Sequence, residues 1–446
     1  MINLLNKIIF LKKKKFVQDT AILQVGSLFS TGLSLLASII YARVLGIEGY
    51  ANYALIFAFV GITSFFLNVG ADQATLTLLS KAYSQKRKDQ VKDILTYYIK
   101  ITLLVSLIVG ILIIIISPFL TTRLYNSYEI GQLARVIIVS NIIKIFWGMY
   151  IVVLQVIRKI KNLTIIENLN KIFYVLIPAG LVLLGLSLKG LVFGYLIVAF
   201  GFAIFSILAY RKLRFKNLIL PSWREIFYNL KDVKLRYYFK FGFLIAIDKN
   251  LSNLYSTLPI FILGIFYLNE VAFFKIAVAY AGLPLILAGS VSRLLTVQLP
   301  KSKLYGLEIL KRDFIRSAIG SFLIVLIISV IFAFLASILI PLAYGREYLS
   351  AIMLSYPLLA ASIIVSLGVG LGPILRTLNL MKASILLNFI LIAIGSCILY
   401  YFIKNYPIQI TIYPIAFFPP LAASTLFIYI IRYLNKKIKN HKNTKN

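Results

Sequence analysis

Apolar residues occur along this chain in long runs that are separated by short polar segments. Each run is close to the roughly 20 helical residues that are needed to cross a hydrocarbon core of about 30 Å. The pattern predicts an all-α integral membrane protein with about twelve transmembrane helices. The predicted helices are residues 20–41, 53–70, 96–116, 134–156, 172–188, 191–210, 241–262, 271–295, 315–339, 351–371, 383–403 and 410–431.

The composition excludes a soluble enzyme. Of the 446 residues, 61% are hydrophobic and 14% are charged, whereas ordinary globular domains have about 45–50% and 25%. The single cysteine, Cys397, and the single histidine, His441, exclude a disulfide framework, a Cys/His metal site and a histidine-based catalytic triad. We therefore expect no metal and no cofactor. The first apolar run has full helix length and no small-residue cleavage site, so no signal peptide is expected.

The chain is strongly basic, with 47 Lys and Arg against 14 Asp and Glu and a net charge of +33. These residues form short clusters between the apolar runs and lack the aromatic interleaving of a nucleic-acid platform, so nucleic acid is not an expected partner. Assigning the clusters to alternate sides puts nearly all of them on one side, which predicts that both termini are cytoplasmic. The other side holds only Arg43, Arg123, Arg135, Lys189, Arg346 and Lys404.

The longest interruption lies near the middle of the chain and predicts a basic amphipathic segment along the inner membrane surface. It divides the chain into a six-helix bundle (1–215), a linker (216–236), a second six-helix bundle (237–434) and a basic tail (435–446). A weak repeat supports this division, because Gly26 precedes Leu45-Gly46-Ile47 as Gly242 precedes Leu263-Gly264-Ile265. Bundles of six helices would be related by a pseudo-two-fold axis along the membrane normal, and such pairs usually enclose a central cavity.

Polar residues line one face of two predicted helices. The first helix carries a stripe that includes Gln24, and the seventh carries a stronger one. Groups facing lipid would be costly, so the stripes should face water or protein. Two interpretations stay open, a cavity lining or hydrogen bonds between helices. The seventh stripe consists of Asp248, Lys249, Ser252, Asn253, Tyr255, Ser256 and Thr257.

Ionisable residues inside the predicted membrane region are few. Lys144 lies about 15 Å into the fourth helix, near the midplane, while Asp248 and Lys249 lie about 10 Å into the seventh. A structural ion pair, for example with Asp248, is the alternative to a cavity role for Lys144 and Lys249. Lys275, close to the outer end of the eighth helix, is placed to snorkel. Asp72 follows the second helix and either lines the cavity or lies among the headgroups.

Chemistry that the sequence lacks narrows the class further. The helices hold no chain of carboxylates suited to cations, no Walker motif and no nucleophile beside a base. A cationic cavity lined by tyrosine and serine suits a solute that carries phosphate and hydroxyl groups. The candidate cavity residues are Lys144, Lys249, Asp248, Ser252, Asn253, Tyr255, Gln24 and Lys275.

Several short motifs lie in or next to the predicted helices. The most specific is the run from Tyr41 to Tyr50, which contains Ala42-Arg43-Val44-Leu45-Gly46. The others are Asp19-Thr20, Gly70-Ala71-Asp72-Gln73-Ala74, Gly242 with Asp248, Leu263-Gly264, Gln298-Leu299-Pro300 and the run from Pro341 to Tyr348. Together they resemble the motifs of the bacterial polysaccharide repeat-unit flippases, the Wzx-like O-antigen and capsule transporters related to the drug-extruding MATE proteins. The resemblance implies that Asp19, Arg43, Gly46 and Asp72 are motif or gating residues.

The resemblance implies a transporter rather than an enzyme. Similar proteins move undecaprenyl-pyrophosphate-linked oligosaccharides from the cytoplasmic to the periplasmic leaflet of the bacterial inner membrane by alternating access. Partners would be this lipid-linked substrate, the bilayer and the polysaccharide polymerase machinery. Alternatives are a cation-coupled multidrug exporter and a membrane glycan polymerase or ligase. The longest outward loop, residues 120–133, offers an enzyme only Arg123 and Glu129 as catalytic candidates.

Overall fold

The computed structural model describes the chain from Lys15 to Asn443. The described part contains helices and turns and no strand, which confirms the predicted fold class. Each of the twelve predicted runs is mostly helical. Eight helical stretches pass a test of length and apolarity for membrane spans. They hold ten of the twelve runs, and the other two lie in α11 and in α12 with α13. Side-chain surroundings are described except at residues 15–25, 27, 236, 237, 240–242, 244, 245, 287, 290, 293, 297 and 441–443.

Contacts divide the chain into two compact units, which we describe separately. Unit 1 comprises residues 1–44, 66–122 and 127–246, and unit 2 comprises residues 45–65, 123–126 and 247–446. The second predicted helix therefore contributes most of its length to unit 2, and the main boundary falls after Ala246. The domain limits expected from the sequence, 1–215 and 237–434, differ from these units because hydropathy does not record which helices contact each other.

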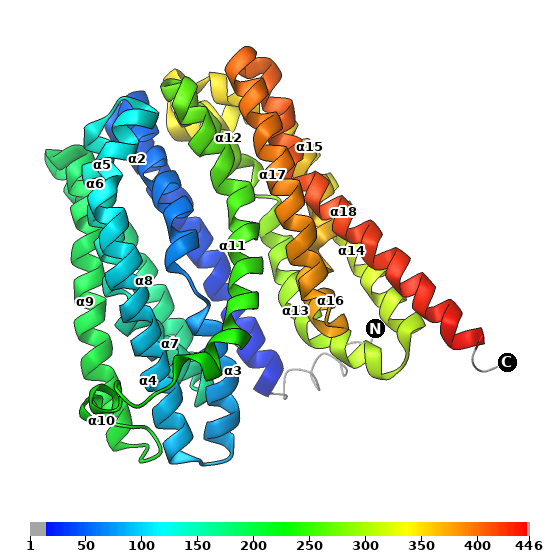
Figure 1. Cartoon of the computed structure of the whole chain (residues 1–446). Helices are drawn as coiled ribbons and strands as arrows, with labels where there is room; N and C mark the ends of the chain where they lie inside the picture. Colours follow the sequence, from blue (N-terminus) through cyan, green and yellow to red (C-terminus); the bar gives the residue numbers. More distant parts are fainter. Residues whose placement is uncertain (1–14, 444–446) are drawn as a thin grey trace. The chain divides into compact units, whose positions relative to one another are not determined.

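Unit 1 is built around α7 and α9, which contact each other: α7 also contacts α3, α4 and α8, and α9 also contacts α6 and α8 (Figure 1). The predicted linker is part of this unit: it forms the short helix α10, which Ser222 and Glu225 begin as a reciprocal capping box. Ile226 in α10 is completely buried, and Trp223 packs on Tyr210 with ring centroids 4.9 Å apart. The helices are α2 (Lys15–Leu67, shared with unit 2), α3 (Ala71–Ser84), α4 (Lys88–Val105), α5 (Ile111–Tyr125), α6 (Tyr128–Ile143), α7 (Ile145–Val156), α8 (Ile160–Leu181), α9 (Ser187–Phe215) and α10 (Trp223–Tyr228), with π-helical turns Ser106–Gly110 and Val182–Leu186.

Unit 2 is built around α15, which contacts α12, α14 and α18, while α18 also contacts α17 (Figure 1). The eighth predicted helix is broken, because Pro284 has no backbone N–H to continue the ladder and α13 begins one residue later. The helices are α11 (Leu235–Phe266), α12 (Leu268–Ala281), α13 (Leu285–Leu304), α14 (Leu307–Tyr344), α15 (Ser350–Val365), α16 (Leu371–Leu378), α17 (Met381–Asn405) and α18 (Ile408–Asn443), with 3₁₀ turns Arg346–Tyr348 and Ser366–Gly370.

Two glycines of the predicted repeat have different structural roles. Gly46 interrupts α2 with φ 66° and ψ −176°, a conformation that a residue with a Cβ rarely adopts, although no atom lies within 4 Å of where a Cβ would be. Gly264 lies inside α11, and a Cβ there would collide with the side chain of Leu55. The first glycine permits a turn between two spans, whereas the second permits close helix packing.

An arginine side chain replaces the hydrogen bond that a proline removes. Pro118 lies inside α5 and cannot donate to the carbonyl of Ile114. Arg135 of α6 donates to that carbonyl from Nε at 2.6 Å, and from a terminal nitrogen to the carbonyl of Ile115 at 3.1 Å. Arg135 therefore has a structural role, which explains an arginine on the side where the sequence places few basic residues.

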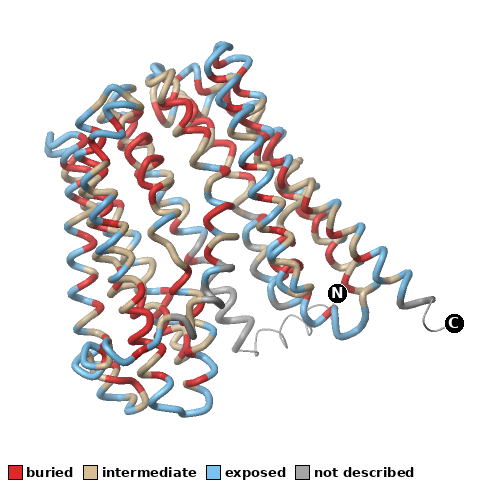
Figure 2. The backbone as a smooth tube through the Cα atoms, viewed as in Figure 1, coloured by how far each residue is buried: buried red, intermediate tan, exposed pale blue. Residues whose placement is uncertain are grey.

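Exposed residues occur along much of the helix surface (Figure 2), and many of them are large and apolar. Leu184, Phe334 and Phe389 are 78%, 79% and 62% exposed. Water-facing surfaces of monomeric proteins rarely carry extended apolar patches of this kind. These faces therefore fit a bilayer and support a multi-pass membrane protein.

Candidate functional site

Lys144 lies at the junction of two helices in unit 1. It ends α6 and begins α7, with φ −62° and ψ −6°. Its ammonium nitrogen donates to Asn141 Oδ1 at 3.2 Å and lies 4.6 Å from the centre of the Tyr174 ring on α8. Within the described part of the chain, no carboxylate forms an ion pair with Lys144. The charge is therefore held by an amide oxygen and an aromatic face, and it keeps free donors.

Tyr174 brings a second unsatisfied group to the same place. Its hydroxyl is buried and has no hydrogen-bond partner among the described residues. The ring packs on Tyr195 of α9, with centroids 5.3 Å apart. A buried hydroxyl without a partner costs free energy, of the order of 1–3 kcal/mol. Lys144 and Tyr174 together thus offer donors to a ligand with anionic or hydroxyl oxygens.

One helical turn beyond Lys144, Gly148 leaves room for two polar groups. A Cβ at Gly148 would collide with the Tyr98 hydroxyl and would lie 3.3 Å from Asp72 Oδ1. Tyr98 also donates to the carbonyl of Ile145 at 3.4 Å. Asp72 is in the first turn of α3, where the positive end of the helix dipole stabilises a carboxylate. The sequence left the place of Asp72 open, and the structure puts it in this polar cluster of unit 1.

In unit 2, Asp248 belongs to a hydrogen-bonded chain between α11 and α17. Ser384 donates to Asp248 Oδ1 at 2.9 Å, Asn388 donates to Ser384 at 3.3 Å, and Tyr255 donates to Asn388 Oδ1 at 3.2 Å. Ser384, Asn388 and Tyr255 are buried. This arrangement is typical of polar side chains that hold membrane helices together. The alternative ion pair between Asp248 and Lys249 does not occur in the described structure.

The predicted stripe on α11 is thus divided between two faces. Lys249, Ser252 and Asn253 are exposed, whereas Asp248 and Tyr255 face the rest of unit 2. Ser252 donates to the carbonyl of Asp248 at 2.8 Å, so its hydroxyl is satisfied within the helix. The sequence treated these positions as one stripe, although at 3.6 residues per turn they spread over about 160° of the helix circumference.

A cavity of about 230 Å³ lies inside unit 2. Tyr255 and Ser256 line it from α11, Ser362 from α15, and Pro419 and Pro420 from α18. Most of its other lining residues are apolar. The cavity is too small and too apolar to be the cationic site that the sequence predicts.

The remaining predicted residues lie apart from these clusters. Lys275 is half-buried in α12 and has no ion pair or hydrogen bond with described residues. Arg43 is exposed and makes contacts near the bend that Gly46 forms. The side chains of Asp19 and Gln24 lie outside the described residues. No group of three or more His, Cys, Asp or Glu in the described part could hold a metal ion.

Sequence reasoning missed Asn141, Tyr174, Ser384 and Asn388. A signal existed for Asn141, because it precedes Lys144 by three residues and therefore lies on the same helical face. Ser384 and Asn388 are likewise four residues apart in one span. Tyr174 could not be found this way, because its partner lies in another helix and no pattern in a single sequence joins the two.

The fold is that of the MATE-like transporters. The chain is similar to an inward-facing multidrug resistance MATE family transporter of the MOP superfamily, with 17% identity, a TM-score of 0.69, and 94% of this chain and 99% of that chain covered. An outward-facing transporter of the same description has 17% identity and a TM-score of 0.66, and the match covers 96% of this chain and 98% of that chain. A MOP superfamily transporter from Pyrococcus furiosus has 16% identity and a TM-score of 0.66, and the match covers 94% of this chain and 95% of that chain. At these identities the likeness shows the fold alone.

Residues 16–296 match the family of polysaccharide biosynthesis proteins. Because the match covers more than half of the chain, the protein belongs to this family, which confirms the resemblance seen in the motifs. No curated protein gives a significant match. Family and fold together define a multi-pass membrane protein of the exporter and flippase class.

Proposed function

We propose that the protein is a flippase, which moves undecaprenyl-pyrophosphate-linked oligosaccharide units from the cytoplasmic to the periplasmic leaflet of the bacterial inner membrane by alternating access. Both termini would be cytoplasmic, and a polysaccharide polymerase would use the product. The family supports a saccharide substrate, and the motif resemblance supports the polyprenyl carrier. In this proposal the pyrophosphate contacts the protein while the polyprenyl tail stays in lipid.

The observation that carries the proposal is the pairing of Lys144 with Tyr174. A lysine at membrane depth is costly unless it meets an opposite charge or water. Here it forms no ion pair with a carboxylate among the described residues, and the ring that it contacts carries a hydroxyl without a partner. A pyrophosphate oxygen would satisfy the ammonium as a point charge, and a sugar or phosphate oxygen would accept from Tyr174.

The cluster around Gly148 favours a substrate with hydroxyl groups rather than a simple anion. Asp72 and Tyr98 lie beside Gly148, which is one helical turn along the chain from Lys144, and they can accept or donate hydrogen bonds. Sugars present hydroxyls that do both. The anionic and the hydroxyl parts of one lipid-linked sugar could thus use neighbouring turns of α7. The P. furiosus transporter is described as having a binding pocket of reverse polarity that suggests a different function, which fits a fold that serves substrates of different charge.

The test uses variants of Lys144 in a host whose own flippase gene is deleted. Surface polysaccharide is measured and normalised to membrane-inserted protein. Lys144→Ala should lower export by about tenfold or more, which corresponds to roughly 1.4 kcal/mol, and Lys144→Arg should keep part of it because the charge survives. Lys404→Ala, which removes an exposed lysine of α17, is the matched control and should export normally.

Reconstituted vesicles distinguish the substrate class. A polyprenyl-pyrophosphate disaccharide should cross in vesicles that contain the protein, and a cationic dye should not. Normal export by Lys144→Ala at normal abundance would refute the role of Lys144. Transport of the dye without transport of the lipid-linked sugar would favour the cation-coupled exporter instead.

A further inference from the structure

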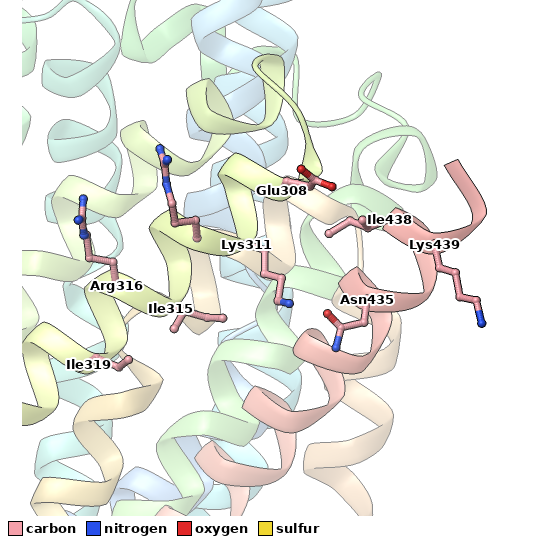
Figure 3. A pocket seen from close by; sticks show the side chains of 9 residues that line it. Glu308, Lys311, Ile315, Arg316, Ile319, Asn435, Ile438 and Lys439 are labelled. Atoms are coloured by element: carbon pink, nitrogen blue, oxygen red, sulfur yellow. The ribbon is translucent and has the colours of Figure 1, made fainter. Parts of the chain in front are cut away.

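A groove of about 830 Å³ runs between the first turns of α14 and the last turns of α18 in unit 2 (Figure 3). Lys311 points into the space between the two helices, and Asn435 approaches the same space from α18 (Figure 3). The groove has no role in the proposed substrate site. Its lining residues are Glu308, Lys311, Arg312, Ile315, Arg316, Ile319, Asn435, Ile438 and Lys439.

The groove has an excess of positive charge. Four lining residues are basic and only Glu308 is acidic. Lys311, Arg316 and Lys439 form no ion pair in the described structure. Arg312 contacts Asp313 at 3.6 Å, but the other oxygen of that carboxylate accepts from Ser302 at 2.6 Å. Three unpaired cations thus border one groove, which favours an anionic occupant.

On α14, the groove runs from two basic residues into the predicted span. Lys311 and Arg312 precede the predicted span 315–339, whereas Ile315, Arg316 and Ile319 lie at its start. On α18, Asn435, Ile438 and Lys439 follow the predicted span 410–431. Lys311, Arg312 and Lys439 therefore lie at headgroup level, and Ile315 and Ile319 lie at the level where the acyl chains begin, with Arg316 between them. A free anion would not use the apolar part.

We propose that this groove binds the headgroup of an anionic phospholipid from the cytoplasmic leaflet. Lys311, Arg312 and Arg316 contact the phosphate, and Asn435 hydrogen-bonds the polar headgroup. The part of the acyl chain next to the headgroup packs on Ile315 and Ile319. Basic pockets between transmembrane helices on the cytoplasmic side are suited to such headgroups. Membrane lipid rather than transported substrate is the occupant, because the groove is lined by residues of unit 2, whereas Lys144 belongs to unit 1, and because the groove carries no tyrosine for sugars.

The test is native mass spectrometry of the purified full-length protein in neutral detergent, titrated with phosphatidylglycerol. The triple variant Lys311→Gln, Arg312→Gln and Arg316→Gln should bind the first lipid about tenfold more weakly or worse, because each basic residue near the surface contributes to anionic-lipid binding. The control Lys81→Gln, Arg87→Gln and Lys88→Gln removes the same charge from exposed positions of unit 1 and should bind normally. Arg316→Glu alone, at an exposed position, should also weaken binding.

Other ligands separate the alternatives. Phosphatidylcholine and inorganic phosphate should not displace phosphatidylglycerol. Equal losses in the two triple variants would overturn the proposal in favour of general charge attraction. Displacement by inorganic phosphate would show a soluble-anion site, and preferred binding of polyprenyl pyrophosphate would show a substrate site; either result would refute a phospholipid site. Normal binding by Arg316→Glu and by the groove triple variant would also refute it.

Discussion

Lys144 in unit 1 and Asp248 in unit 2 are both ionisable residues in predicted transmembrane runs, yet the structure satisfies them differently. Asp248 accepts from Ser384 in a chain that includes Asn388 and Tyr255. Lys144 meets Asn141 and the face of Tyr174 and keeps donors free. The first arrangement joins two helices, whereas the second leaves capacity for a ligand.

The difference shows why membrane depth alone does not identify a binding residue. Both residues are costly in lipid, and both occur in helices with other polar groups. The useful distinction is whether the protein itself completes the hydrogen bonds. A completed network is expected to contribute to stability, and an incomplete one to binding.

The largest expected effect is a separation of export from stability. Lys144→Ala should reduce export about tenfold or more while the unfolding temperature in detergent stays the same or rises, because an unpaired charge is removed. Asp248→Ala should lower the unfolding temperature, because Ser384 loses its acceptor inside unit 2. Thermal unfolding of the purified variants, measured beside export per inserted protein, checks both.

The reverse outcome would break the comparison. A destabilised Lys144→Ala with normal export per molecule would make Lys144 structural. A double-mutant cycle between Asp248→Ala and Ser384→Ala should give a coupling of about 0.6 kcal/mol, the average for interhelical hydrogen bonds in membrane proteins. Strict additivity would mean that the hydrogen bond contributes nothing.

A smaller effect is expected from removing one hydroxyl in each unit. Tyr174→Phe keeps the ring beside Lys144 and removes a hydroxyl without a protein partner, so stability should not fall and export should drop severalfold. Tyr255→Phe removes the donor to Asn388 and should cost about 0.6 kcal/mol of stability without a specific loss of export. Stability gained by Tyr174→Phe with unchanged export would show that the hydroxyl has no ligand.

The sequence predicted the helices well because apolar run length directly reports the span of a membrane. It did not predict the breaks at Lys144 and at Pro284, because the apolar pattern continues through both. It also did not predict that residues 45–65 belong to unit 2. Such groupings depend on helix contacts, which a single sequence does not record.

The repeated Leu-Gly-Ile motif illustrates the same limit at one residue. The sequence at Gly46 and Gly264 is alike, and the repeat supported a division into two bundles. The structure uses the first glycine for its positive φ and the second for packing against Leu55. The sequence identified Lys144 as a candidate site residue because a charged side chain inside a predicted membrane span is energetically costly. Tyr174 was missed because its importance comes from a neighbour on another helix.

The smallest expected effect concerns the exposed face of α11. The comparison of Lys144 with Asp248 assigns this face neither to binding nor to stability. Ser252 is exposed, whereas Leu251 beside it is 3% exposed and faces unit 2. Exposure in the structure does not distinguish water from lipid. A hydrophilic methanethiosulfonate reagent distinguishes the two, because it reacts with the cysteine thiolate. A cysteine in hydrocarbon stays protonated and therefore does not react.

Cysteines are therefore placed singly at Ser252, Ser256 and Leu251 after the exposed Cys397 has been replaced by serine. Ser252→Cys and Ser256→Cys should react in intact membranes, and Leu251→Cys should not, with export unchanged before labelling. Equal reaction at all three positions would mean that α11 is loosely packed. Failure of both serine positions would place this face against lipid or protein, so that Lys249 would snorkel rather than meet substrate. Reaction at the serines alone would extend the wet surface to Lys249, and unit 2 would then supply a cation of its own to the substrate.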